Sequence, residues 1–154
     1  MQQADQNSYL GFHDDHVYGF SIREEAGDHA TLVLDIDHIV EWIEPVDGRY
    51  RFKVVPAFLA FHEVRDLVIN INYSFPNVEI GPFSIDGVQQ APCTCPDGSE
   101  GYEWHIGVNY PEGGVTFKGK RYTLSYRAEP VTSDTTRLPA ETRRHLLGSD
   151  DNAK

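Results

Sequence analysis

Apolar and polar side chains alternate along residues 31–42, in the stretch TLVLDIDHIVEW. Every second position from Leu32 to Trp42 is apolar, except that His38 interrupts the series. A period of two over this length is typical of a long β-strand with one buried face and one wet face. The neighbouring segments can be arranged around this strand.

Residues 14–24 are the predicted upstream partner of this strand, joined to it through a loop at 26–28. This register places Ile22 opposite Leu32 and Phe20 opposite Leu34, so that both apolar sets share one face. A register shifted by one residue would turn the apolar side chains of the partner to water. Continued to its end, the register predicts that His16 lies opposite His38.

Residues 49–55 are the predicted downstream partner, after a turn signal at Pro45-Val46-Asp47-Gly48. A loop at 46–48 sets Trp42 against Phe52, Glu41 against Lys53 and Val40 against Val54. The three segments together predict a meander with one apolar face.

The remaining chain carries further strand signals and one weak helix signal. Residues 57–73 predict two strands with a tight turn or bulge at His62-Glu63, or else a short helix over 60–67. The later segments are an interrupted edge strand at 78–85, a long loop at 87–101, a hairpin at 102–126 and a short helix within 136–147.

About seven antiparallel strands without a long amphipathic helix predict a mainly β fold. The two candidate architectures are a β-sandwich and a partly open barrel, each with a short C-terminal helix. We expect a flexible leader at 1–8, a single β domain at 9–129 and a polar tail at 130–154. The tail is predicted to be disordered or to hold a short docked helix.

The composition favours a soluble, cytoplasmic protein. Apolar residues make up 40% of the 154 residues, which is enough for a core, and the longest apolar stretch is too short to span a bilayer. Cys93 and Cys95 are the only cysteines and lie in one predicted loop, so no disulfide framework is expected. They are interpreted as ordinary loop thiols.

The formal net charge of −11 argues against nucleic acid as a direct partner. Residues 1–50 hold 11 acidic side chains and two arginines, so the acidic field belongs to the first meander. Such a field can steer a basic protein partner, although solubility alone is the other interpretation. The predicted binding residues are Asp35, Asp37, Glu41, Trp42 and Trp104.

Histidines and aspartates near the start of the meander are the best candidates for chemistry. If His16 and His38 lie opposite each other, their imidazoles can share a divalent metal ion, with Asp14 as a third ligand. His13 is the candidate fourth ligand or base. In the alternative interpretation the two histidines close the open end of the core through hydrogen bonds and hold no metal.

No nucleophile elbow or phosphate-binding glycine loop occurs in the sequence, and we assign no catalytic residue. A small-molecule site near Trp42 and Trp104, between the sheets, is a further alternative. The edge strand at 78–85 leaves either a monomer or an edge-strand homodimer open.

Three short motifs carry a resemblance to known proteins. They are Phe12-His13-Asp14 followed by Val17 and the strand 32–36, the pattern Ala57-x-Leu59-x-Phe61-x-x-Val64-x-x-Leu67, and the final Gly-Gly hairpin. Over residues 9–128 the chain resembles small uncharacterised bacterial proteins, some of which are similar to immunity proteins of toxin systems. The resemblance implies binding and blocking of a toxin, and it implies no catalytic residue.

The leading hypothesis is therefore a non-enzymatic, acidic protein-binding module. The alternatives are a divalent-metal-binding module or metal-dependent hydrolase that uses His16, His38 and Asp14, and a small-molecule-binding protein.

Overall fold

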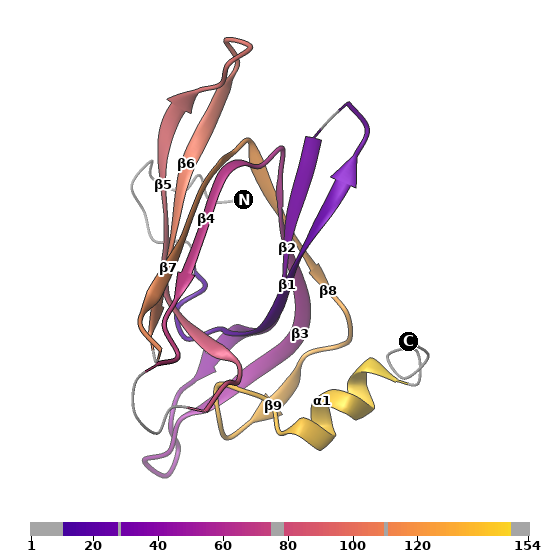
Figure 1. Cartoon of the computed structure of the whole chain (residues 1–154). Helices are drawn as coiled ribbons and strands as arrows, with labels where there is room; N and C mark the ends of the chain where they lie inside the picture. The colour runs from indigo at the N-terminus through magenta and orange to yellow at the C-terminus, as the bar shows by residue number, and fades with distance from the viewer. Residues whose placement is uncertain (1–10, 28, 75–78, 110, 149–154) are drawn as a thin grey trace.

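The structure is a computed structural model that describes residues 11–27, 29–74, 79–109 and 111–148, and almost all of its elements are strands (Figure 1). In chain order the elements are β1 (His16–Glu25), β2 (His29–Ile43), β3 (Arg51–His62), β4 (Arg65–Ile71), β5 (Phe83–Thr94), β6 (Glu100–Asn109), β7 (Gly113–Gly119), β8 (Arg121–Tyr126), β9 (Val131–Ser133) and α1 (Ala140–Leu147).

The nine strands form one antiparallel sheet in the order β4-β7-β6-β5-β1-β2-β3-β8, with β9 paired to β3. The prediction of a mainly β, antiparallel fold with a short C-terminal helix is confirmed. The sheet does not close on itself. It has more strands than the sequence suggested, since β9 and the division of the last predicted strand into β7 and β8 were not anticipated.

The pairing of β1 with β2 follows the predicted register over most of its length. Ile22 lies opposite Leu32 and Phe20 opposite Leu34, and the turn begins after the pair Glu25–His29. The register shifts between Val17 and Gly19, where Tyr18 is the extra residue of a β-bulge. At Val17 and His16, which precede the bulge, each pairing is therefore displaced by one residue from the predicted register.

The pairing of β2 with β3 also contains a bulge. Trp42 lies opposite Phe52 and Glu41 opposite Lys53, as predicted. The predicted pair of Val40 and Val54 is wrong, because the register shifts there and Ile39 takes the place opposite Val54. Ile39 and Val54 both belong to a second apolar cluster.

A corner joins the two halves of the sheet. His62 pairs with Arg121 on one side of the corner and Arg65 pairs with Lys118 on the other, so the same register continues through it. Glu63 has a φ of 55°, which confirms the predicted tight turn at this point. The corner brings β1, β2, β3 and β8 to face β4, β5, β6 and β7 (Figure 1).

The main core fills the inner face between these halves. The Phe61 ring of β3 lies 5.0 Å from the Trp104 ring of β6 and 4.8 Å from the Phe117 ring of β7. All three side chains are buried. The same cluster includes Leu32, Leu34 and Ile36, the apolar series from which the β2 strand was predicted.

The predicted loop at 87–101 is largely wrong. Residues 87–94 continue β5 and pair with β6 up to Thr94 opposite Glu100. The sequence pattern did not indicate this strand, because most of its side chains are polar or small and one of its faces lies in water. Pro92 is tolerated because β5 has no second partner there among the described residues, and proline is compatible with an edge.

The C-terminal segment covers the outer face of β2 and β3. Ile39, Phe52, Val54 and Leu138 form a second buried cluster, and Leu146 of α1 packs against it. The helix predicted within 136–147 is confirmed, with Pro139 at its start and Gly148 after its end. The predicted leader at 1–8, Val78 and residues 149–154 lie outside the described residues. In the part of the chain that the structure describes, no helix is long and apolar enough to cross a membrane.

Candidate functional site

Asp15 and His38 form a buried acid–imidazole pair where β1 begins. Backbone bonds hold the entry to β1 against β5: the Asp14 amide donates to the Ile85 carbonyl at 2.9 Å, and the Ile85 amide donates to the Asp15 carbonyl at 2.8 Å. The Asp15 side chain then points inward, where its Oδ2 lies 2.6 Å from His38 Nδ1. Its Oδ1 accepts a bond from the Ile39 amide at 2.9 Å.

Burial controls the electrostatics of this pair. Asp15 is fully buried, and burial raises the pKa of its carboxyl to about 6, against the opposing effect of His38 and the Ile39 amide. The His38 ring packs 5.4 Å from the Phe12 ring and 6.2 Å from the Tyr126 ring, measured between centroids. Two aromatic rings therefore pack against the imidazole.

An acid–imidazole pair is the orienting part of many catalytic dyads, in which the imidazole also reaches a nucleophile. Among the described residues, no serine, threonine or cysteine is hydrogen-bonded to His38. The pair links the entry of β1 to the middle of β2 through hydrogen bonds.

Asp37 is the centre of a second polar network, on the outer face of the same strand. Its Oδ2 accepts bonds from the Tyr18 hydroxyl at 2.8 Å and from the Leu138 amide at 2.9 Å. Its Oδ1 accepts a bond from Arg143 Nε at 2.9 Å. Asp37 is fully buried, so these bonds compensate the carboxylate for its lost water.

Asp35 continues this network along β2. Its Oδ1 accepts bonds from Arg143 Nη2 at 2.5 Å and from Arg127 Nη1 at 2.9 Å. Burial opposes the charge of Arg143, but its bonds to Asp37 and Asp35 outweigh this effect and raise its pKa. The Arg143 guanidinium also lies 3.8 Å from the centroid of the Tyr18 ring, in a cation–π contact.

The predicted binding residues therefore separate into three environments. Asp35 and Asp37 bind arginines of the same chain, and Trp104 is 1% exposed in the main core. Glu41 and Trp42 lie near the exposed end of the β2–β3 hairpin, where Glu41 Oε2 is 3.6 Å from Lys53 Nζ. The structure thus leaves only Glu41 and Trp42 of this set at the surface and close together.

The prediction that His16 lies opposite His38 is wrong. The bulge at Tyr18 places His16 opposite Asp37, and His38 turns to the inner face, where it binds Asp15. His16 Nδ1 is buried without a hydrogen-bond partner, and burial, followed by the positive charge of Arg137, lowers the pKa of this imidazole.

The other two predicted metal ligands also lie elsewhere. His13 Nδ1 is 2.7 Å from the Asp86 carbonyl oxygen, and its Nε2 is 3.5 Å from Asp14 Oδ2. No group of three or more histidine, cysteine or acidic side chains in the described part of the chain is arranged to hold a metal ion. The opposed histidine pair that motivated the metal hypothesis is therefore absent from this fold.

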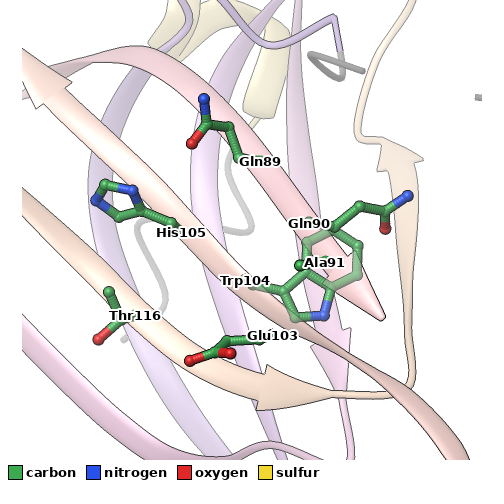
Figure 2. A pocket seen from close by; sticks show the side chains of 7 residues that line it. All are labelled: Gln89, Gln90, Ala91, Glu103, Trp104, His105 and Thr116. Carbon is green, nitrogen blue, oxygen red and sulfur yellow. The ribbon is translucent and has the colours of Figure 1, made fainter. Parts of the chain in front are cut away.

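A polar hollow lies on the outer face of β5, β6 and β7. It measures about 380 Å³ and is lined by Gln89, Gln90, Ala91, Glu103, Trp104, His105 and Thr116 (Figure 2). His105 lies between Gln89 and Thr116 on the paired strands. Figure 2 shows these polar side chains spread along the strands rather than converging on one point. The hollow lies away from the polar networks of β2.

Sequence reasoning assigned no role to Asp15, Tyr18 and Arg143, the residues that complete the buried networks. Asp15 lies beside the candidate histidines but was given no role, because strict alternation assigned its neighbour Asp14 to the face of His16. One usable signal was charge: residues 1–50 are strongly acidic, whereas the tail contains three arginines. This contrast favours ion pairs between arginines of the tail and acidic residues of the first meander.

No protein-family model, curated protein or solved structure matches this chain.

Proposed function

We propose that this protein is a non-enzymatic protein-binding module and that the end of its β2–β3 hairpin is the contact surface. We define the hairpin end by four exposed apolar residues, Val40, Trp42, Val46 and Tyr50. The proposed partner is a protein with a basic surface. An immunity-like role, in which the chain binds and blocks a toxin, is one form of this function.

The exposure of two large aromatic side chains is the observation that carries the proposal. Trp42 is 49% exposed and Tyr50 is 58% exposed, although both belong to the aromatic residues that proteins usually cover. Their rings meet edge to face at 6.4 Å, and the Phe52 ring supports Trp42 from 4.9 Å. Rigid tryptophan and tyrosine side chains of this kind dominate binding energy at protein interfaces.

Charge supports a basic partner. The whole chain has a net charge of −11, and on the hairpin end Glu44 and Asp47 lie beside Arg49 and Arg51, while Glu41 faces Lys53. Asp15, Asp35 and Asp37 contribute to this charge but are bonded inside the fold. Other acidic side chains, including those near Trp42, are exposed. The net negative charge of the chain would increase the rate at which a basic partner associates.

Photo-crosslinking in the native host tests this proposal. A photoreactive amino acid is placed at Trp42 or Tyr50, and a control is placed at Val68 of β4, which is 59% exposed on the other half of the sheet. We expect one protein with a basic surface to be captured from positions 42 and 50 but not from position 68.

The captured protein is then purified and its affinity for this chain is measured. We expect a one-to-one complex that weakens with added salt and that Trp42→Ala weakens by about 30-fold or more. The matched control, Val68→Ala, should leave the affinity unchanged. Equal capture at all three positions, no capture at any, or a complex that tolerates Trp42→Ala would overturn the proposal.

A further inference from the structure

A line of side-chain hydrogen bonds crosses the outer face of β1, β2, β3 and β8. The Thr123 hydroxyl oxygen of β8 lies 2.9 Å from His62 Nε2 of β3, and His62 Nδ1 lies 3.5 Å from the Thr31 hydroxyl oxygen of β2. The Thr31 hydroxyl in turn donates to Glu25 Oε1 of β1 at 2.5 Å. Four side chains from four strands are therefore joined in series.

The proton of the Thr31 hydroxyl fixes the direction of these bonds. Thr31 gives its one hydroxyl proton to the Glu25 carboxylate, which is an acceptor only when it is ionised. Thr31 Oγ1 can then only accept from His62, and this assigns the imidazole proton to Nδ1. His62 Nε2 is left without a proton and accepts the bond from the Thr123 hydroxyl.

This is the arrangement of an activated hydroxyl nucleophile. A hydroxyl becomes nucleophilic when an imidazole takes its proton and a third group orients the imidazole and stabilises its positive charge. Glu25 Oε1 lies 3.8 Å from His62 Nδ1 and supplies the negative charge. The His62 side chain is 15% exposed, whereas Thr123 is fully at the surface, so a reagent can reach the hydroxyl while the imidazole is held in place.

Arg121 adds a positive charge on the same face. It lies directly opposite His62 and two residues before Thr123 on β8. Side chains two residues apart on a strand share a face and are about 7 Å apart along it, a distance that an arginine side chain can span. Arg121 forms no ion pair with another described residue, so its guanidinium is available to an oxygen that becomes negatively charged beside Thr123.

We propose that Thr123 is an acyl-acceptor site, which takes one acyl group from a carboxylic ester. Thr123 Oγ1 forms a bond to the ester carbonyl carbon, and its proton passes to His62 Nε2. The bond between that carbon and the leaving oxygen then breaks, and the leaving oxygen takes the proton from His62. The products are an O-acyl threonine and the released alcohol or phenol. The step occurs once per chain, so it adds a modification site to the binding function proposed above.

A second threonine–histidine pair in the chain provides an internal control. Thr116 of β7 is also exposed and lies opposite the exposed His105 of β6. No hydrogen bond joins these two side chains in the described part of the chain. A Cβ atom at Gly114 would stand 3.1 Å from His105 Nε2, so this imidazole lies beside the glycine instead. Thr116 therefore has a neighbouring imidazole but no base bonded to its hydroxyl.

Labelling with p-nitrophenyl acetate is the first test. Cys93→Ser and Cys95→Ala are introduced beforehand, because thiols also accept acyl groups, and acetylated positions are located by mass spectrometry of peptides. We expect acetylation of Thr123 to be about 100 times faster than that of Thr116, or more. Equal rates at the two threonines, or no acetyl group at Thr123, would overturn the proposal.

Substitution of the base is the second test. We expect His62→Gln to slow acetylation of Thr123 about 100-fold or more, since an amide cannot take up the proton. Thr123→Ser keeps a hydroxyl at the same position and should still be acetylated. A rate that His62→Gln leaves unchanged contradicts the proposal. Thermal melts establish that the variants are folded, and the comparison of Thr123 with Thr116 decides the matter even if His62→Gln is not.

Thr31 acts through His62 as a positioning residue, and a pair of variants tests this role. Thr31→Val keeps the shape of the side chain and removes the acceptor for His62 Nδ1, so acetylation of Thr123 should slow by about tenfold or more. Thr31→Ser restores the hydroxyl and should restore the rate. Equal rates in Thr31→Val and Thr31→Ser would show that Thr31 does not orient the base.

The acylation site and the proposed partner contact can be tested separately. Thr31, His62 and Thr123 lie at the opposite end of β2 and β3 from Trp42. Trp42→Ala should therefore leave acetylation of Thr123 unchanged, and Thr123→Val should leave the affinity for the captured partner unchanged. Failure of one proposal is thus distinguishable from failure of the other.

Discussion

At the scale of single residues, Asp15 shows how burial and hydrogen bonding oppose each other. Its carboxyl is fully buried and still accepts bonds from the His38 ring and the Ile39 amide. Burial is the larger effect, and the pKa rises to about 6 from an ordinary value of 3.8. The folded state therefore holds this proton more tightly than the unfolded chain does.

A pH dependence of stability follows from this raised pKa. Between about pH 4 and pH 6 the folded protein binds more protons at Asp15 than the unfolded chain, so the free energy of unfolding decreases as pH rises. We expect a decrease of up to roughly 3 kcal/mol that Asp15→Asn removes. Urea denaturation of both proteins at a series of pH values measures the difference.

Asp14→Asn is the control for this measurement, since the Asp14 side chain is partly exposed and its Oδ2 lies 3.5 Å from His13 Nε2. If the stability difference between the wild type and Asp15→Asn were constant from pH 4 to pH 7, the assignment of this titration to Asp15 would be wrong.

At the scale of elements, polar contacts hold α1 to the sheet more than apolar burial does. The helix has no fully buried residue, and its eight residues are too few to form a stable helix alone. Arg143 anchors it by bonds to Asp37 and Asp35, while Leu138, just before the helix, fills the second apolar cluster. Two aspartates in the middle of β2 thus determine where the tail docks.

Removal of Arg143 should be costly for this reason. Arg143→Ala leaves the buried Asp37 carboxylate without its ionic partner, and we expect a loss of about 3–5 kcal/mol in the free energy of unfolding. Arg144→Ala, at the exposed neighbouring position, should change stability by less than about 0.5 kcal/mol. Equal effects of the two substitutions, measured by chemical denaturation, would refute the anchoring role of Arg143.

The pairing of β4 with β7 depends on one glycine. Gly113 lies opposite Ile71, and a Cβ atom at this glycine would stand 2.2 Å from the carbonyl oxygen of Asn70. Gly113→Ala must therefore displace the backbone of β4, and we expect the end of that ladder to open.

Hydrogen exchange of the β4 amides, measured by NMR, would report this opening as a loss of protection. The matched control is Gly81→Ala, because a Cβ atom at Gly81 would meet nothing within 4 Å. Unchanged protection of β4 in Gly113→Ala would contradict the close approach.

At the scale of the whole molecule, the two halves of the sheet share one main core. Phe61 of one half contacts Trp104 and Phe117 of the other, and the corner at residues 62–65 and 118–121 links the two halves through a continuous register. Neither half has a complete core of its own, so the halves should unfold together.

The two tryptophans provide separate probes of this cooperativity. Trp42 lies on the β2–β3 hairpin and Trp104 on β6, so Trp104→Phe and Trp42→Phe each leave one reporter. We expect each single-tryptophan protein to give the same urea midpoint by fluorescence as by circular dichroism. An earlier fluorescence midpoint for Trp42 than the circular dichroism midpoint of the same protein would show that the hairpin opens separately.

The local pattern of side chains was sufficient to predict the meander of β1, β2 and β3, the turn at His62-Glu63 and the C-terminal helix. Alternation predicts strands because side chains on successive residues point to opposite faces. It could not locate the bulges at Tyr18 and Val40, because one extra residue reverses the faces without any local mark in the sequence. For the same reason the sequence placed His16 opposite His38 and did not predict that Asp15 binds His38.

By itself, then, the sequence determined which segments are strands and which apolar side chains belong to the core, since those depend on periodicity within each segment. Only the tertiary structure decided what the charged residues of β2 do. Asp35 and Asp37 bind Arg127 and Arg143, which lie about a hundred positions away along the chain, and His38 binds Asp15 across a bulge. These contacts depend on how the sheet curls and where the tail docks, and no periodicity within a single segment encodes either.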